Sequence, residues 1–461
     1  MPNLIMPTAA NERGVGKMPP VRLVNMMPER GAGQDGVTLI QRPALSAFAA
    51  VTGGNGVRGL HPFGEGIVAT HTAGADLVGD DGAVSFVGAL AGSDRTRAAP
   101  GASGLMICAD QRLWWLEGLT ISPVSFPDGA QVQDVAYLGG FFLASRRGTS
   151  AIYWSDALEP LTWNALSFVS AESADDPVVA LMATSDELWS FGATTTQVFY
   201  LSGDGEAVIA PYQGRTFSRG CAARDTVVSL DNTLFWVGDD LNVYRAEGVP
   251  VVISEPWVSE RLRRCVGQSG NAGDLSAWTY LLDGHAVYVL CCGPNEPAMA
   301  YDASTQVWSL FEVWSGGWRC PVGAQVGALC VAGDALTQSV FRLDPNGSSD
   351  ALETVMQRRA PFFMPIGGGR VQCAVVRLWA SAGWGSLSGQ GLDPQAWLRW
   401  SDDQGQTWTD WVWRSSGRAG EYALDLQWRR LGQARYPGRW FEVMMTDPVP
   451  WRISGATVNE Q

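Results

Sequence analysis

The sequence is poor in the residues that most often carry catalysis and bind metals. Its three histidines, His61, His71 and His285, share no spacing, and none of the eight cysteines belongs to a C-x-x-C pair. A metal site needs converging ligands, so we expect no metal, no cofactor and isolated histidines at the surface or in turns. Scattered cysteines without pairing motifs predict buried free thiols in a protein made in a reducing cytoplasm.

Charge is also scarce, and positive charge most of all. Only 17% of the residues are charged, and 32 Lys and Arg stand against 46 Asp and Glu, which gives a formal net charge of -14. Proteins that grip nucleic acid neutralise its phosphates with a basic surface, so this balance argues against such a role. It does not exclude a protein that surrounds DNA without holding it, because an acidic wall repels phosphate.

Long apolar runs are absent as well. No segment approaches the length of a membrane-spanning helix, and we therefore expect no membrane span. The N-terminal residues Met1–Leu4 do not begin a basic region followed by an apolar core, so we predict no signal peptide and a soluble product synthesised in the cytoplasm.

Glycine, proline and tryptophan are abundant, at 54, 25 and 21 residues. Gly and Pro punctuate turns, and Trp suits a half-buried pleated surface, so the composition predicts many short strands. From Val57 to Val340, paired apolar runs recur roughly every 40–55 residues, the period of a four-stranded propeller blade. The six pairs are Ile67–Thr70 with Gly74–Leu77, Leu105–Cys108 with Leu113–Leu116, Phe141–Ala144 with Ala151–Trp154, Leu188–Phe191 with Gln197–Tyr200, Leu234–Val237 with Asn242–Arg245, and Ala286–Val289 with Ala298–Tyr301.

The predicted fold class is all-β, a β-propeller of about five to seven blades with six favoured. We assign residues 1–50 to an N-terminal extended docking arm, because their prolines show no sustained periodicity. Residues 51–345 form the propeller, and residues 346–461 form a small sandwich-like or platform β domain. An array of β-sandwiches is the alternative to the propeller, and Glu255–Arg264 has the apolar spacing of a helix.

The sharpest local motif lies in the C-terminal domain. Ser401, Asp403, Gly405, Thr407 and Trp408 match S-x-D-x-G-x-T-W, the Asp-box of sialidases and related propellers. In this motif the aspartate accepts hydrogen bonds from turn amides, the glycine supplies a positive φ, and the tryptophan packs beneath the hairpin. A sialidase would repeat the motif and add a three-arginine carboxylate clamp and a nucleophilic tyrosine. We therefore predict a structural turn and no catalytic residues.

Two further groups of charged residues leave alternatives open. The acidic pairs in Asp80–Asp81, Asp175–Asp176 and Asp239–Asp240 have the chemistry of calcium ligands or of acid–base pairs, but acidic turn residues are the simpler interpretation. A basic stretch near the C-terminus indicates either contact with an acidic partner subunit or a solvated face paired with local carboxylates. It consists of Arg414, Arg418, Arg429, Arg430, Arg435 and Arg439.

Short motifs in a fixed order along nearly the whole chain resemble the tail hub, or nozzle, proteins of short-tailed phages. This family is also called the packaged-DNA stabilisation, or tail accessory factor, family. Two segments depart from the pattern: Gln197 replaces an acidic residue, and Arg42–Leu45 lacks the usual Pro-Gly pair. The matching segments are Gly14–Lys17, Leu23–Glu29, Arg42–Pro43, Val57–Gly59, Tyr153–Asp156, Trp163, Ala171–Glu172, Asp175–Pro177, Phe191–Gly192, Thr196–Phe199, Gly220, Phe235–Asp239, Val243–Arg245, Tyr301–Trp308, the Asp-box hairpin, Trp428–Gly432 and Thr446–Pro448.

The resemblance implies a structural virion protein rather than an enzyme. Such proteins form a homohexameric ring below the portal and the head-to-tail adaptor, and they present a tail needle or plug, tailspike or fibre. They retain packaged double-stranded DNA and let it pass through the lumen during ejection without sequence-specific binding. The resemblance also implies a propeller with added platform and tip segments, assembled into the virion tail in the host cytoplasm.

Two other functions remain as alternatives. The Asp-box and the many tryptophans are compatible with a sialidase-like propeller that acts on host surface polysaccharide. They are equally compatible with a non-catalytic glycan-binding module, since sugars stack on aromatic rings. A carboxylate pair or an arginine clamp that converges in one pocket would favour the first of these.

Overall fold

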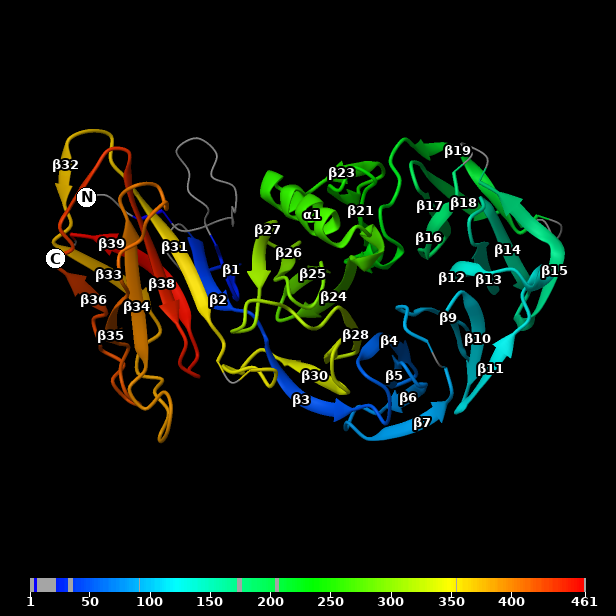
Figure 1. Ribbon diagram of the computed structural model, residues 1–461, viewed down its shortest axis with the longest axis horizontal. Helices are drawn as coiled ribbons and strands as arrows, with labels where there is room; N and C mark the ends of the chain where they lie inside the picture. Colours follow the sequence, from blue (N-terminus) through cyan, green and yellow to red (C-terminus); the bar gives the residue numbers. More distant parts are fainter. Residues whose placement is uncertain are drawn as a thin grey trace.

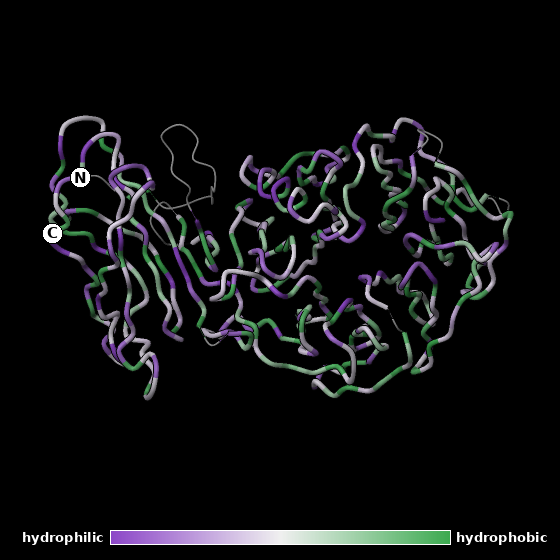
Figure 2. The backbone as a smooth tube through the Cα atoms, in the orientation of Figure 1, coloured by the Kyte–Doolittle hydropathy of each residue, from purple (hydrophilic) through white to green (hydrophobic). Residues whose placement is uncertain are grey.

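Short strands and tight turns make up nearly all of the chain. The computed structural model describes residues 4–5, 22–31, 36–90, 92–171, 176–203, 207–353 and 355–459. A ring of small sheets lies beside an elongated second β body (Figure 1). Hydrophobic and hydrophilic segments are interleaved throughout both bodies (Figure 2), as expected for sheets whose strands alternate between buried and exposed side chains. The predicted all-β fold, a propeller followed by a smaller β domain, is confirmed.

The ring consists of seven four-stranded antiparallel sheets, or blades, within the described part of the chain. Each blade begins at its innermost strand, next to the ring axis, and proceeds outward. Blades 1 to 3 contain β4 (Val57–Phe63), β5 (Gly66–His71), β6 (Ala75–Val78) and β7 (Val84–Gly88); β8 (Arg97–Pro100), β9 (Leu105–Ala109), β10 (Arg112–Glu117) and β11 (Thr120–Val124); and β12 (Val132–Leu138), β13 (Phe141–Arg146), β14 (Ala151–Asp156) and β15 (Glu159–Ser170).

The remaining blades follow the same order except at the last strand of the ring. Blades 4 to 7 contain β16 (Val178–Ala183), β17 (Glu187–Gly192), β18 (Thr196–Leu201) and β19 (Ile209–Phe217); β20 (Val228–Leu230), β21 (Thr233–Val237), β22 (Val243–Ala246) and β23 (Pro250–Val252); β24 (Ser276–Leu282), β25 (His285–Cys291), β26 (Ala298–Asp302) and β27 (Val307–Phe311); and β28 (Val322–Val326), β29 (Leu329–Gly333), β30 (Ser339–Asp344) and β3 (Ala44–Ala50).

The favoured count of six blades is wrong, because a seventh is completed by a strand from the N-terminal region. All six predicted hairpins correspond to the second and third strands of blades 1 to 6. In blade 7 the outermost strand β3 pairs with β30, with Ala44 opposite Asp344 and Ala50 opposite Ser339. Hydrogen bonds between β3 and β30 thereby close the ring. Blade 7 has four strands in space, but its fourth strand precedes blade 1 in the sequence.

Two-residue loops fix the register of several blades. Asp283 and Gly284, which join β24 to β25, both have positive φ, at 51° and 83°. This conformation is the type I′ turn that matches the twist of antiparallel strands, and Asp-Gly is one of its preferred sequences. The strand that follows, His285–Cys291, is buried along its whole length, so a one-residue slip would bring the wrong side chains to the core.

One α-helix, α1 (Pro256–Ser269), follows blade 5 and confirms the helix predicted around Glu255–Arg264. It begins with proline at its first position, ends at Gly270 in the left-handed conformation, and buries Trp257 and Leu262. Within the described residues, no helix is both long and apolar enough to cross a membrane. Short 3-10 turns also lie between blades, at Pro127–Gly129, Arg224–Thr226 and Ala272–Asp274.

The second body consists mainly of two sheets with the order of a β-sandwich. A five-stranded sheet has the order β1-β2-β39-β33-β36, a four-stranded sheet has the order β31-β38-β34-β35, and β32 pairs with β37 in a short ribbon. These strands are β1 (Met26–Arg30), β2 (Val37–Gln41), β31 (Arg358–Pro365), β32 (Arg370–Gln372), β33 (Val375–Ala380), β34 (Gln395–Ser401), β35 (Val412–Ser415), β36 (Gln427–Arg429), β37 (Gln433–Arg435), β38 (Gly438–Met445) and β39 (Arg452–Val458).

The second half of the predicted docking arm, residues 1–50, contributes strands to both bodies of the same chain. Residues 26–30 and 37–41 form β1 and β2 of the sandwich, and residues 44–50 form β3 of blade 7. The arm is therefore ordered by partners within its own chain, which supply the hydrogen bonds and apolar surface that the segment lacks alone. Of residues 1–25, only 4–5 and 22–25 are among the described residues.

Residues Leu23–Asn25 join the two bodies through main-chain hydrogen bonds. On the propeller side, Asn25 N donates to Leu310 O at 2.8 Å, and Leu310 N donates to Leu23 O at 2.9 Å. On the sandwich side, Val24 N donates to Arg359 O and Arg359 N donates to Val24 O, both at 3.0 Å. Leu310 belongs to blade 6 and Arg359 to the sandwich. One hydrophobic cluster, which includes Leu23, Val24, Trp308 and Phe362, continues across this junction.

A buried ion pair lies at the same junction. Arg42 Nη1 and Nη2 donate to Asp350 Oδ1 and Oδ2 at 3.1 and 2.5 Å, and both side chains are about 1% exposed. Arg42 Nε donates to Asn25 Oδ1, whose Nδ2 donates to the carbonyl oxygens of Glu312 and Gln357. The guanidinium also lies 4.8 Å from the ring centre of Trp318. This network connects the N-terminal segment, the end of blade 6 and the start of the sandwich.

We predict that D350A or R42A destabilises the protein by about 3–5 kcal/mol, because either leaves an uncompensated buried charge. The double variant R42M/D350L, with apolar side chains at both positions, is expected to lose much less. The measurement is the urea midpoint and the calorimetric unfolding profile of each variant.

The matched control is R377A/D425A, which removes an ion pair of 2.8 Å whose aspartate is 44% exposed. A pair open to solvent contributes about 0–1 kcal/mol. Equal losses for D350A and for this control would contradict a central role for the buried pair.

Candidate functional site

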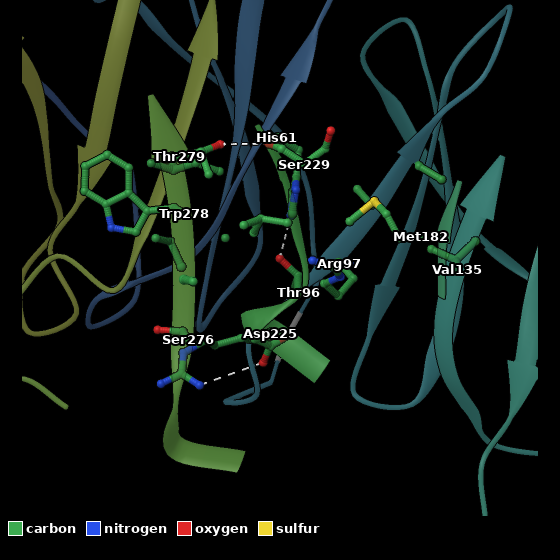
Figure 3. Close-up of a pocket in the computed structure, with 18 of the residues that line it drawn as sticks. His61, Thr96, Arg97, Val135, Met182, Asp225, Ser229, Ser276, Trp278 and Thr279 are labelled. Carbon is green, nitrogen blue, oxygen red and sulfur yellow. Dashed lines mark hydrogen bonds and ion pairs between the residues drawn. The ribbon is translucent and has the colours of Figure 1, made fainter. Parts of the chain in front are cut away.

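The innermost strands of all seven blades surround a central cavity of about 500 Å³. Figure 3 shows His61, Thr96, Arg97 and Asp225 pointing toward this space from different blades and connections. Among the described residues that line the cavity, Asp225 is the single carboxylate, and it pairs with Arg224 at 2.9 Å and with Arg95 at 3.8 Å. The paired carboxylates that glycoside hydrolysis requires are not among these lining residues.

The charges around the cavity link neighbouring blades. Arg97 Nε lies 3.4 Å from Asp134 Oδ1, and Arg97 Nη1 donates to Val227 O at 2.9 Å. Asp134 also accepts a hydrogen bond from Leu181 N at 2.9 Å, while Arg224 Nη1 donates to Gln133 O at 3.0 Å. Burial raises the pKa of Asp134, and the charges of Arg97 and Arg224 oppose that effect. This geometry fits interlocked blades rather than a reactive centre.

The histidines are not the isolated surface or turn residues that we expected. His71 is buried beside Asp76 at 3.5 Å, and His285 Nδ1 lies 2.7 Å from Asp302 Oδ2. His61 lies at the cavity, with Nε2 at 2.8 Å from Thr96 Oγ1. Sequence spacing did not reveal these partners, because two of the pairs form across adjacent strands and the third, His61–Thr96, joins blade 1 to the connection before blade 2.

The cysteines and the acidic pairs have structural surroundings. All eight cysteines are buried and free, as predicted, and burial raises the pKa of Cys108 and of Cys221 to about 12. Asp176 accepts hydrogen bonds from the amides of residues 193–195, and Asp240 accepts one from Asn242 N. Asp240 is therefore a turn residue, as interpreted, whereas Asp176 is a buried residue before β16 that binds the turn between β17 and β18; Asp175 lies outside the described residues. No group of three or more His, Cys, Asp or Glu in the described ranges is arranged to bind a metal.

The Asp-box forms the connection between β34 and β35 of the sandwich, not a turn of the propeller. Asp403 Oδ1 accepts hydrogen bonds from Ser401 Oγ and Thr407 N, both at 2.8 Å, and Oδ2 accepts one from Thr407 Oγ1 at 2.5 Å. Gly405 has a φ of 81° and donates its amide to Ser401 Oγ at 2.7 Å. The hydrogen bonds from Thr407 lower the pKa of Asp403 to about 2.

The Asp-box tryptophan borders a small arginine-rich pocket of about 190 Å³. Its lining includes the side chains of Arg22, Arg359, Arg399, Trp408, Trp440 and Glu442. Arg399 stacks on Trp408 at 4.7 Å and on Trp411 at 4.5 Å from the ring centres, and it pairs with Glu442. Three arginines thus converge, as in a carboxylate clamp, but no tyrosine lines the described part of this pocket.

The six arginines of the basic stretch have different surroundings. Arg439 is buried and pairs with Asp402 at 2.7 Å from both Nε and Nη2, so it is a structural residue of the Asp-box region. The other five are exposed. The stretch therefore contains one buried structural arginine and five exposed arginines. The three-arginine pocket was missed because its residues come from segments that are far apart in the chain.

The chain is similar to several solved structures at low sequence identity. The chain is similar to the computationally designed Ika8 protein (11% identity over 65% of this chain and 99% of the other, TM-score 0.41) and to the N-terminal domain of Nup159 (11%, 70% and 99%, TM-score 0.40). It is also similar to the extracellular domain of the hybrid two-component system BT4673 from B. thetaiotaomicron (9% over 80% of this chain, TM-score 0.45), of which it spans 47%. No curated protein matches the chain significantly.

Family models match both bodies. Residues 21–266 match the β-propeller of bacteriophage P22 Gp10, and residues 362–461 match its β-sandwich. The fold and these matches define a structural protein of a phage tail, which assembles with other virion proteins. The chain belongs to the bacteriophage P22 Gp10 family, the short-tailed phage tail hub proteins that its motifs resemble.

We predict opposite pH effects for H61Q and H285Q. Burial, and next the charge of Arg97, lower the pKa of His61 to about 3. As the pH falls, His61 therefore takes up a proton in the unfolded chain before it does so in the folded protein. Protonation of His61 thus lowers the free energy of unfolding as the pH falls from about 6.5 toward 3. The hydrogen bond to Asp302 raises the pKa of His285, so that site stabilises at low pH and loses its contribution as the pH rises.

Urea midpoints measured from pH 7.5 to pH 4 test these signs. Relative to the unmodified chain, H61Q should lose less stability on acidification and H285Q should lose more. Parallel curves for all three proteins would show that neither histidine senses its surroundings as described.

Proposed function

We propose that this chain is the tail hub, or nozzle, of a short-tailed phage. In this role it retains the packaged genome and conducts it into the host during ejection. The match of both bodies to the P22 Gp10 family is the observation that carries the proposal. We further propose a homohexameric ring that contacts the head-to-tail adaptor above and a needle, plug, spike or fibre below.

The physical properties of the chain support a scaffold rather than a catalyst. The buried Arg42–Asp350 pair and the shared hydrophobic cluster hold the propeller and the sandwich in one arrangement, as a part under pressure from packaged DNA requires. The net charge of -14 favours repulsion of the duplex, so DNA can slide past without being held. We propose that the protein has no enzymatic activity.

The test is DNA retention by particles that lack this protein. We expect heads assembled without it to package DNA and then lose it to nuclease, and we expect purified protein, added before nuclease, to restore protection. The measurement is the fraction of nuclease-resistant genome per particle. Particles that keep their DNA without the protein, or that fail to bind it, would contradict the hub role.

The arginine pocket favours a second candidate function, the binding of a carboxylate-bearing sugar without turnover. Arg22, Arg359 and Arg399 supply three positive charges, which Glu442 and, at 3.8 Å from Arg359, Glu312 offset in part. Trp440 is 8% exposed and its buried Nε1 has no hydrogen-bond partner. Acidic sugars combine a carboxylate for arginine with a ring face for tryptophan, and tryptophan and arginine are also strong anchors for partner proteins.

Titration with sialic acid and glucuronic acid, followed by saturation-transfer NMR, tests this candidate. We expect saturable binding that W408A and R359Q each weaken at least about tenfold, which corresponds to about 1.4 kcal/mol. W384A, at an exposed tryptophan outside the pocket, is the control. Absence of saturable binding, or an equal loss in W384A, would exclude the pocket as a sugar site.

A further inference from the structure

The short ribbon formed by β32 and β37 presents like charges directly opposite each other. Arg370 on β32 is the cross-strand partner of Arg435 on β37. Side chains in such pairs have Cβ atoms about 5 Å apart, and two positive charges at that position destabilise the pair. Arg429 and Arg430 follow in the adjoining segment, and all four side chains are exposed. We refer to Arg370, Arg429, Arg430 and Arg435 as the arginine ribbon.

The arginine ribbon has no acidic partner among the described residues. None of its four residues forms an ion pair with any described residue, and Arg429 Nε donates only to Gln427 Oε1, at 3.2 Å. The flanking segments 366–376 and 426–441 contain no Asp or Glu. Arginine binds carboxylates in a bidentate fork, so the ribbon is suited to a surface rich in carboxylates.

One face of the propeller is such a surface. In blades 1 to 6 the first and third turns, and in blade 7 the first turn, open on the same side of the ring, because the strands are antiparallel and each blade begins at its innermost strand. The described residues of these turns and the strand ends beside them expose ten carboxylates and contain no arginine or lysine within the turns. This acidic face consists of Glu65, Asp80, Asp81, Glu117, Asp156, Glu159, Asp186, Asp231, Glu247 and Asp283.

The opposite face of the propeller has a different composition. This side is mixed in charge, because its described second turns and connections between blades carry thirteen Asp and Glu and also eight arginines. The arginines are Arg95, Arg147, Arg219, Arg224, Arg261, Arg263, Arg264 and Arg319. Of the ten carboxylates on the acidic face, Glu247 alone forms an ion pair with a described residue, Arg245, at 3.4 Å.

The arginine ribbon and the acidic face do not meet within one molecule. The strand β32 lies at the end of the sandwich farthest from the ring (Figure 1), with the whole sandwich between it and the blades. Within one molecule, neither surface supplies the counter-charge of the other. A second copy of this chain offers the complementary surface in each direction.

We propose that the arginine ribbon of one copy binds the acidic face of the propeller of a second copy. The contact is heterologous, since a different patch of each copy takes part, and such contacts generate rings when the rotation closes. It supplies a subunit contact for the proposed hub ring, and in that respect it rests on the proposed function. Duplex DNA is the competing ligand for an arginine ribbon, but the acidic face and the net charge of -14 oppose its approach.

Sedimentation velocity at low salt and at about 0.5 M salt tests the contact, because screening weakens exposed charge pairs. We expect the unmodified chain to self-associate at low salt, and R370E/R435E to weaken association at least about tenfold. The control R414E/R418E makes the same change in charge on exposed sandwich arginines outside the ribbon and should associate normally. Circular dichroism and the melting temperature verify that each variant is folded.

Reciprocal variants identify the acidic face as the partner. E65R/D80R/D81R on blade 1 and D156R/E159R on blade 3 reverse the charge at two places on that face. We expect at least one of them to lose self-association, and a mixture of that variant with R370E/R435E to regain it. The mixture restores one unmodified contact, between the normal ribbon of the first protein and the normal face of the second.

Three results would overturn the proposal: a monomer at every salt and protein concentration tested, equal losses in R370E/R435E and R414E/R418E, or association that neither acidic-face variant affects. Fluorescence anisotropy with a short DNA duplex tests DNA as the competing ligand. Duplex binding that depends on the arginine ribbon, by a protein that stays monomeric, would also contradict the proposal. The DNA-retention assay on particles distinguishes failure of this contact from failure of the proposed hub role. If ribbon-dependent association occurs but particles keep their DNA without the protein, the hub role fails and the contact stands.

Discussion

A buried ion pair between Arg42 and Asp350 is the contact on which the arrangement of the two bodies depends. Its residues are distant in the sequence, yet they meet where the N-terminal segment passes from the sandwich to the propeller. Asn25 extends the pair to the main chain at Glu312 and Gln357, so four segments converge on one buried polar network. Such a network rigidifies a structure only when its groups are satisfied, and here the guanidinium has partners at all three nitrogens.

The N-terminal segment connects the closure of the ring to the junction between the two bodies. Leu23–Asn25 is held by main-chain hydrogen bonds to blade 6 and to the sandwich, and β3, which follows β1 and β2 in the sequence, closes the ring. The last strand added to blade 7 is therefore covalently attached to the segment that holds the sandwich. Opening the ring and separating the two bodies are coupled events, which suits a part of a tail that must stay closed under load.

The sequence was sufficient for the fold class and for much of the repeat. Its six paired apolar runs are the second and third strands of six blades, because those central strands are the most apolar and the least interrupted. The seventh blade and the strands formed by the N-terminal segment could not be predicted from the sequence, because β3 and its partner β30 are separated in the chain by nearly the whole propeller. Pairing between strands so far apart produces no repeating pattern of apolar residues in the sequence.

The candidate surfaces were predictable only in part. The Asp-box geometry follows from its motif, because every hydrogen bond in it spans at most four residues. The arginine pocket and the charge asymmetry of the propeller depend on which turns share a face, and that information appears only once the strands are paired. Arg439 illustrates the limit, since the other five arginines of the basic stretch are exposed while it is buried and pairs with Asp402.

The most direct measurement of the central claim is an electron cryomicroscopy map of the intact phage particle. The account predicts a ring of seven-bladed propellers, each with its sandwich in the orientation held by the Arg42–Asp350 junction, below the portal and adaptor and around the DNA path. A particle whose tail contains no such propeller on that axis, or in which the chain forms a peripheral spike that binds host glycans, would contradict it.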